Sequence, residues 1–156
     1  LDALTPGKRL YMFSTGTGFA PFASLVRDPD TYERYEEVIV THTCRDVNEL
    51  IYSRTLIDSL KDDPLVGEMV GDKLKLYTTT TREHYERMGR ITTLIENGKL
   101  FEDLGVPPLD PATDRAMICG SMEMIQDVKT LMLKAGLTEG SNAAPAEFVI
   151  EKAFAG

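Results

Sequence analysis

The sequence has no tryptophan, only two cysteines and no long run of hydrophobic residues. Nothing approaches the ~20 apolar residues that a helix needs to cross a bilayer, so we expect no membrane-spanning segment. Basic residues are also scarce, because 17 lysines and arginines stand against 25 aspartates and glutamates, which gives a net charge of −8. That charge argues against nucleic acid and anionic membranes as partners, since both need a basic surface.

The two cysteines, Cys44 and Cys119, are far apart and belong to no paired motif. They are typical of reduced thiols in a cytoplasmic protein rather than of a disulfide framework. No spacing of cysteine and histidine indicates a zinc site. With 156 residues the chain has the size of one domain, and we expect it to bury a hydrophobic core.

Short apolar runs alternate with segments of helical periodicity along the chain. The runs predict strands over residues 9–14, 38–40, 74–80, 116–119 and 148–150. The periodicity predicts helices from about Pro21, over residues 49–60 and 92–97, and from Ser121 to Gly136. In the second helix, one buried side is expected to hold Leu50, Ile51, Leu56, Ile57 and Leu60. This alternation predicts an α/β domain with a five-stranded parallel sheet and helices on both faces.

Ligands of such sheets bind beyond the carboxyl ends of the strands, and a glycine-rich segment follows the first predicted strand. It contains Thr15, Gly16, Thr17, Gly18 and Pro21. The glycines let the backbone approach a ligand closely, and the N-terminus of the next helix suits a phosphate. A tight turn without a ligand is the alternative. The segment lacks the lysine of a nucleoside-triphosphate loop and the third glycine of the common dinucleotide fingerprint.

Arginines recur near the predicted strand ends. Arg45 follows the second strand, where an arginine accommodates the 2′-phosphate of NADP and an acidic residue would bind the free 2′-hydroxyl of NAD. Arg82 follows the third strand, and Arg54 and Arg90 lie further along the chain. Together they predict one anion pocket, because planar guanidinium groups suit phosphate. The alternative is a set of solvated surface arginines, and Arg54 has an ordinary surface partner in Asp58, four residues on.

Two further segments fall at predicted strand ends. Cys119, Gly120 and Ser121 form a turn in which a small thiol could lie against a planar ring, and Ser121 could cap the following helix. A small buried cysteine is the alternative. The last strand carries Glu151 toward the same edge, where a solvated tail is the alternative. His42, near the end of the second strand, is expected to line or support the site.

These segments together resemble the bacterial ferredoxin–NADP reductases, within the wider flavin reductase superfamily. Residues 15–21 resemble that family's nicotinamide and pyrophosphate loop. Residues 44–52, with Cys44, Arg45, Glu49 and Tyr52, resemble its adenosine-side segment. Arg82 and Arg90 resemble the arginines that flank its 2′-phosphate pocket, and the Cys119-Gly120 turn with Met124 resembles the turn that faces the nicotinamide. Residues 148–154 resemble its C-terminal strand and tail.

The resemblance implies a Rossmann-like NADP(H)-binding domain and a set of functional residues. In the family, NADPH gives hydride to the flavin of FAD, and single electrons pass to or from ferredoxin or flavodoxin. Thr17 and Cys119 would then position the nicotinamide, and Glu151 would assist near the contact of nicotinamide and flavin. Ala153 stands where plant-type relatives carry a terminal aromatic residue over the flavin, and Phe154 would take part of that role.

The resemblance also implies a division of the protein. The family's FAD lies on an N-terminal β-barrel with an Arg-x-Tyr-Ser pattern, which this sequence lacks. Residues 1–8 resemble the linker after the barrel, and residues 9–156 would be the NADP(H)-binding domain. We therefore expect half of a two-domain enzyme, unable to complete the redox reaction alone.

Three alternatives stay open on the sequence. One is an NAD(P)H-dependent flavin reductase of the same superfamily with another acceptor. Another is a non-catalytic nucleotide-binding module. A phosphate-transfer enzyme has the least support, because neither a phosphate-binding lysine nor a pair of metal-binding carboxylates is evident.

Overall fold

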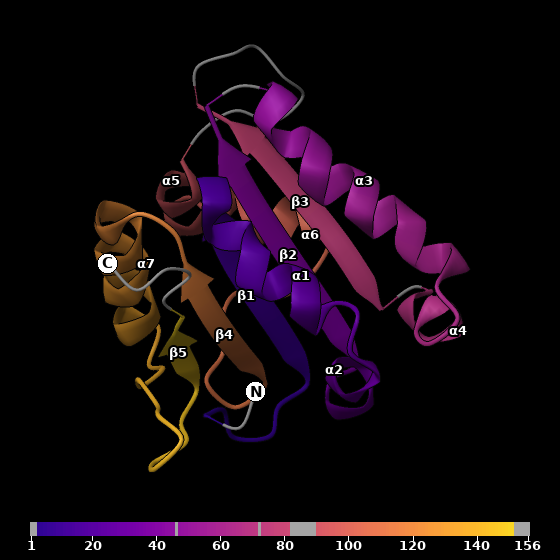
Figure 1. The fold of residues 1–156 in the computed structure, drawn as a ribbon. Helices are drawn as coiled ribbons and strands as arrows, with labels where there is room; N and C mark the ends of the chain where they lie inside the picture. Colours follow the sequence, from indigo (N-terminus) through magenta and orange to yellow (C-terminus); the bar gives the residue numbers. More distant parts are fainter. Residues whose placement is uncertain (1–2, 46, 72, 82–89, 152–156) are drawn as a thin grey trace.

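The protein folds around one parallel sheet of five strands (Figure 1). The computed structural model describes residues 3–45, 47–71, 73–81 and 90–151, apart from the side chain of Thr17. The strands are β1 (Arg9–Thr15), β2 (Glu37–Cys44), β3 (Leu74–Thr80), β4 (Asp114–Cys119) and β5 (Phe148–Ile150). Their order across the sheet is β3-β2-β1-β4-β5, and every neighbouring pair is parallel.

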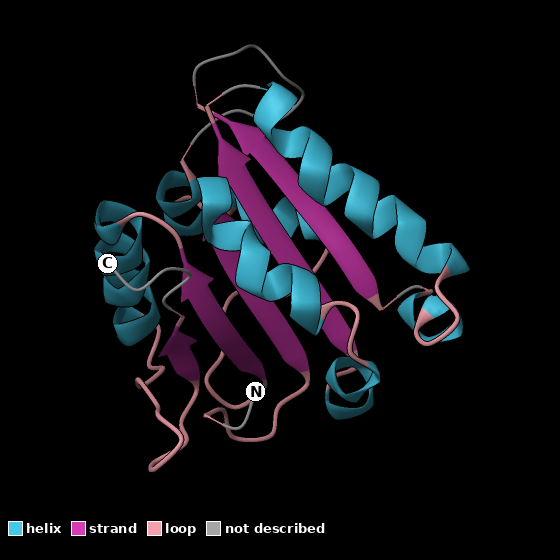
Figure 2. Ribbon diagram, in the orientation of Figure 1, coloured by secondary structure: helices cyan, strands magenta, loops and turns pink. Residues whose placement is uncertain are grey.

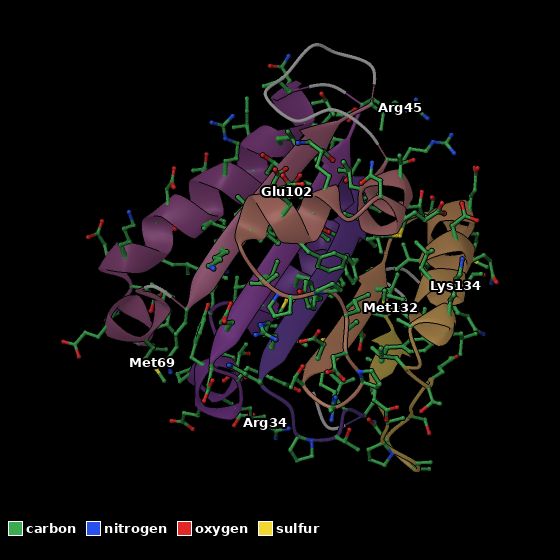
Figure 3. The ribbon with its side chains drawn as sticks, turned by 180° about the vertical axis from the view of Figure 1, so that it is seen from behind. Arg34, Arg45, Met69, Glu102, Met132 and Lys134 are labelled. Atoms are coloured by element: carbon green, nitrogen blue, oxygen red, sulfur yellow. The ribbon has the colours of Figure 1, made fainter. Side chains whose placement is uncertain are left out.

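Helices cover both faces of the sheet (Figures 1 and 2). One face carries α1 (Ala20–Leu25), α2 (Pro29–Arg34), α3 (Ile51–Ser59) and α4 (Gly67–Val70). The view from behind in Figure 3 shows the other face, with α5 (Ile91–Glu96), α6 (Lys99–Leu104) and α7 (Met122–Lys134). Short 3-10 turns cover Gly16–Phe19, Val47–Leu50 and Leu60–Asp62.

The two faces of β1 show why the sheet is buried throughout. Leu10 and Met12 belong to the core under α1–α4, whereas Tyr11 and Phe13 belong to the core under α5–α7. Successive side chains of a strand point to opposite faces, so a strand covered on both sides needs a continuous apolar run. All four side chains are fully buried.

The predicted fold class is confirmed, and the structure corrects some of its details. Helices α2, α4 and α6, of four to six residues, were not predicted, because they show no clear helical period. Helices α1 and α5 have six residues each, but Pro21 and Gly98 marked their ends in the sequence. Ile51 was wrongly assigned to the buried side of its helix: it is 56 % exposed, whereas Leu60 is buried. Nine residues at 100° each place these two side chains on opposite sides of the helix.

The strand order fixes where a ligand can bind. The chain runs from β1 outward through β2 to β3 and then crosses to β4 and β5 on the other side of β1. The carboxyl ends of β1 and β4 therefore lie at the point where the strand order reverses, which is the usual ligand position in open α/β sheets.

The segment before β1 is packed against the rest of the domain. Ala3 and Leu4 are buried, and Leu4 forms a bridge with Ala146 just before β5. The guanidinium group of Arg115 is 7 % exposed and donates hydrogen bonds to four carbonyl oxygens. Two of these belong to the segment, Thr5 O at 3.0 Å and Pro6 O at 2.6 Å, and the others to Pro111 and Asp114. Arg115 thus ties the first residues to β4.

Replacing this buried arginine should cost much of the stability of the domain. We expect Arg115→Met to lower the free energy of unfolding by about 2–4 kcal/mol, because carbonyl groups lose a charged donor and stay partly buried. Urea unfolding followed by circular dichroism measures the change. The matched control is Arg27→Met at an exposed position, which should stay within about 0.5 kcal/mol of the parent chain. Equal unfolding midpoints for the two variants would contradict the role of Arg115.

Candidate functional site

A cleft of about 1100 Å³ lies beyond the carboxyl ends of the strands. Its lining includes the residue that follows each strand or ends it: Thr15 at β1, Arg45 at β2, Thr81 at β3, Gly120 at β4 and Glu151 at β5. The cleft therefore lies beyond the carboxyl ends of the strands, as predicted from the alternation of strands and helices, and it includes the switch point between β1 and β4.

Two glycine turns meet at the bottom of the cleft. A Cβ atom on Gly18 would lie 2.5 Å from the carbonyl oxygen of Cys119 and 2.8 Å from the Cα of Gly120. A Cβ on Gly120 would in turn collide with the hydroxyl of Thr15. Only glycine permits this approach. The floor of the cleft is thus made of peptide groups rather than side chains, which leaves room for a ligand close to the backbone.

The N-terminus of α7 opens onto the same cleft. Ser121 caps this 13-residue helix, and its hydroxyl accepts a hydrogen bond from the backbone N–H of Met124 at 3.3 Å. Ser121, Met122 and Glu123 line the cleft. The unsatisfied amides of a helix N-terminus carry a partial positive charge. By contrast, α1 has six residues and Pro21 does not line the cleft, so the glycine loop itself, and not a long helix, borders the site on that side.

Arg45 and Arg90 lie on the part of the cleft formed by β2, α5 and the first turn of α7 (Arg45 is labelled in Figure 3). The backbone N–H of Arg45 donates to a carboxylate oxygen of Glu49 at 3.0 Å, which fixes the turn after β2. Arg90 precedes α5, and its Nη1 lies 3.5 Å from a carboxylate oxygen of Glu123. Both partners of this pair are well exposed, so the pair is weak and Arg90 can exchange Glu123 for another anion.

The structure brings most of the predicted site residues together. Those that line the cleft are Thr15, Gly16, Gly18, Arg45, Arg90, Gly120, Ser121, Met124 and Glu151. Arg54 is exposed on α3 and, like Pro21 and Cys119, is not among the lining residues. Arg82, Ala153, Phe154 and the side chain of Thr17 lie outside the described residues.

The thiol of Cys119 is 1 % exposed and belongs to the core on the α1 side of the sheet. Its neighbour Gly120, not Cys119 itself, lines the cleft. Cys44 is also buried, and burial raises the pKa of its thiol to about 11. Neither cysteine forms a disulfide. In the part of the chain that the structure describes, no group of three metal-binding side chains is found and no helix is long and apolar enough to cross a membrane.

Some lining residues were not predicted as part of the site, among them Thr92, Glu123 and Asp127. Glu123 and Asp127 are four residues apart and therefore share one side of α7. The sequence shows that they share a side, but only the packing of α7 against the sheet shows that this side borders the cleft.

We expect Gly18→Ala to destabilise the domain by about 2–4 kcal/mol, because the added methyl group overlaps backbone atoms that cannot move aside cheaply. The matched variant is Gly16→Ala. Gly16 has a φ of +50° but open space around it, so alanine there should cost only about 1–2 kcal/mol of backbone strain. Urea unfolding of the two variants tests the contact, and a larger loss for Gly16→Ala would argue against it.

The two thiols should react slowly in the folded chain. At pH 8 a pKa of about 11 leaves Cys44 a thiolate fraction roughly 200 times smaller than that of an unperturbed cysteine. Labelling by a thiol reagent, with the sites resolved by mass spectrometry, should therefore be far slower in buffer than in 8 M urea for both cysteines. Rapid labelling of Cys44 in the folded chain would show that its pocket is open.

Comparison with known proteins gives relatives of one kind. The flavodoxin/ferredoxin–NADP reductase of Rhodobacter capsulatus is 56 % identical over 156 residues, which cover 100 % of this chain and 58 % of the relative. The ferredoxin–NADP reductase of Azotobacter vinelandii is 47 % identical over 152 residues, which cover 97 % of this chain and 59 % of the relative. The chain thus spans a little over half the length of these proteins.

A solved structure agrees with the fold described above. A ferredoxin NADP+ reductase from Neisseria gonorrhoeae with bound FAD and NADP superimposes with a TM-score of 0.83 at 28 % identity, covering 98 % of this chain and 59 % of that one. The family model described as the oxidoreductase NAD-binding domain matches residues 12–130, from within β1 to within α7. Because this match takes in most of the chain, the protein belongs to the oxidoreductase NAD-binding domain family.

Proposed function

We propose that this chain is the NADP(H)-binding half of a two-domain ferredoxin– or flavodoxin–NADP reductase, whose FAD lies on a separate domain. The observation that carries the proposal is the cleft at the switch point, which is lined by both Arg45 and Arg90 and has glycine turns at its floor. The names of the relatives from Rhodobacter capsulatus and Azotobacter vinelandii support the reaction class.

The arginines are proposed to select NADP over NAD. Arg45 stands at the end of β2, where an acidic residue would favour the free 2′-hydroxyl of NAD. Arg90 would exchange Glu123 for the 2′-phosphate, and Arg82 is a further candidate from outside the described residues. Planar guanidinium groups bind phosphate oxygens in pairs. An NADH-dependent relative with another acceptor is the runner-up, and Arg45 argues against it.

The glycine floor fits the remainder of the dinucleotide. Side chains at Gly18 and Gly120 would fill the space where the backbone approaches the ligand. The N-terminus of α7 adds partial positive charge at the same place. When bound, the nicotinamide supplies the hydride that is exchanged with the flavin of the other domain. Thr15, Gly16 and Gly120 are the residues proposed to hold and orient it, with Thr17.

Cys119 and Glu151 are proposed to act at the same end of the cleft. Because the Cys119 thiol is buried, we assign it the role of fixing the turn that carries Gly120. Glu151 lines the cleft, and its backbone N–H donates to the carbonyl oxygen of Ile118 at 2.8 Å, which holds it beside β4. Its carboxylate would stand near the contact of nicotinamide and flavin. Ala153 and Phe154 would extend the chain toward the flavin.

The rest of the enzyme is proposed to precede this chain. An FAD-binding β-barrel would join it through residues 1–8, and ferredoxin or flavodoxin would exchange electrons with the complete protein. On this proposal the domain described here binds NADP(H) alone but does not turn it over.

The test is a calorimetric titration with 2′-phospho-AMP and with 5′-AMP at low salt. We expect the 2′-phosphate compound to bind at least about tenfold more tightly, since one arginine–phosphate hydrogen bond contributes roughly 1.5–3 kcal/mol. Arg45→Ala should remove most of this difference. Arg27→Ala, a change at an exposed position outside the cleft, should leave it intact.

Equal affinities for the two nucleotides in the parent chain would mean that the arginines do not form a 2′-phosphate site. If the preference exists but survives Arg45→Ala, the selecting group is another arginine, and Arg90→Ala is then the decisive variant.

A further inference from the structure

His42 is buried beneath the glycine loop and connects it to the neighbouring helix. Its side chain is on β2 and the residue is 2 % exposed. Nε2 lies 2.8 Å from the carbonyl oxygen of Gly16, and Nδ1 lies 2.7 Å from the hydroxyl oxygen of Ser53 on α3. The ring of Phe19 stacks on the imidazole at 5.1 Å between centroids. Nε2 also lies 3.3 Å from the thiol sulfur of Cys44. The imidazole thus has four close neighbours, and Nε2 is directed at the loop and at that thiol.

The hydrogen-bond partners determine which nitrogen carries the proton. A carbonyl oxygen can only accept, so the contact with Gly16 requires a proton on Nε2. Burial lowers the pKa of His42, which keeps the ring neutral at pH 7, so Nδ1 has a free lone pair. Nδ1 then accepts from the hydroxyl of Ser53. The same hydroxyl also donates to the carbonyl oxygen of Leu50 at 3.1 Å, so its one proton is shared between Nδ1 and that carbonyl.

This contact has a consequence for the far side of the same peptide group. In a planar trans peptide the C=O and the N–H point in opposite directions. Because the carbonyl of Gly16 points inward to His42, the backbone N–H of Thr17 points outward, away from the core. Gly16 is exposed and lines the cleft, and its φ of +50° allows this turn of the backbone. An outward amide at such a turn is a typical anion-binding group.

We propose that His42 is a positioning residue of the nucleotide site: its Nε2–H holds the carbonyl of Gly16 inward, so that the backbone amide of Thr17 faces the pyrophosphate of the dinucleotide. The inference rests on the proposed NADP(H)-binding function. It gives His42, which lines the cleft and is almost fully buried, the role of orienting the glycine loop.

A pair of amide side chains separates this role from a merely structural one. In His42→Gln the terminal NH₂ occupies nearly the position of Nε2 and can still donate to Gly16. In His42→Asn the shorter side chain reaches only as far as Nδ1, so it can keep the contact with Ser53 and lose the one with Gly16. Ser53→Ala is the control that loses the outer contact of His42 and keeps the contact with Gly16.

The experiment titrates each folded variant by calorimetry with NADP+ and with 2′-phospho-AMP, which lacks the pyrophosphate. We expect His42→Asn to weaken NADP+ binding by about tenfold, the loss of one hydrogen bond, and to change 2′-phospho-AMP binding by less than about twofold. His42→Gln should stay within about threefold of the parent chain for both ligands, and Ser53→Ala should behave likewise.

A separate measurement on the parent chain needs no variant. Long-range ¹H–¹⁵N correlation spectra report which nitrogen of a histidine is protonated, and the sequence has only two histidines, His42 and His84. We expect the Nε2–H tautomer for His42. The Nδ1–H tautomer would overturn the proposal, even if His42→Asn fails to fold.

The outcomes distinguish the inference from the function on which it rests. If the parent chain binds neither ligand, the NADP(H) proposal fails and the role of His42 falls with it. If both ligands bind but NADP+ affinity is the same in His42→Asn, the function stands and the positioning role is wrong. If NADP+ affinity in His42→Asn and Ser53→Ala falls in proportion to their loss of stability, His42 is a core residue only.

Discussion

The close approach of two backbone turns, at Gly18 and at Cys119-Gly120, is the contact on which the site depends. It brings the ends of β1 and β4 together at the switch point, where the hydroxyl of Thr15 also reaches Gly120 and accepts from the backbone N–H of Ser121 at 3.4 Å. The strand order makes these two strands neighbours, and the absence of Cβ atoms lets their turns touch. Arg45 follows β2, which pairs with β1, and Glu151 follows β5, which pairs with β4. The two strands whose turns meet therefore also position these residues beside the floor.

An acidic chain can bind an anion because the relevant charges are local. The net charge of −8 is spread over the whole sequence, and salt screens exposed charges beyond about 8 Å at physiological ionic strength. Arg45 and Arg90 line the cleft, and so do four carboxylates, those of Glu49, Glu123, Asp127 and Glu151. A bound phosphate must therefore compete with carboxylates already present, of which Glu123 is paired with Arg90 at 3.5 Å. Such competition lowers the affinity of the cleft for every anion, and most for an anion that carries little charge.

Much of the fold and part of the site could be predicted from the sequence. The strands could be predicted from continuous apolar runs, because both faces of the sheet are buried. The glycine loop and Arg45 could be predicted as site residues from their places at strand ends. Helices α2, α4 and α6 show no clear period, whereas Pro21 and Gly98 marked the equally short α1 and α5. The partners of His42 come from residues 26 positions before it and 11 positions after it, and no local pattern links them. The carboxylates of α7 enter the site through tertiary packing alone.

The arginines fall into a structural group and a functional group. Whether an arginine is fully paired within the protein distinguishes the two groups better than its position in the sequence does. Arg9 and Arg115 are buried near the amino ends of the strands. Arg9 is paired with Asp114 at 3.2 Å and Glu37 at 3.5 Å, and Arg115 donates to four carbonyl groups. A buried guanidinium must be paired, because an unpaired one would cost several kcal/mol. In Arg9 the pairing is by charge as well as by hydrogen bond, since its Nε makes only the 3.5 Å ion pair with Glu37. At the carboxyl ends, Arg45 and Arg90 are exposed, and water satisfies the donors that the protein does not. A ligand can replace that water at little cost. The carboxyl ends of the strands, where folding leaves the arginines incompletely paired, are therefore the end of the sheet that can bind a ligand.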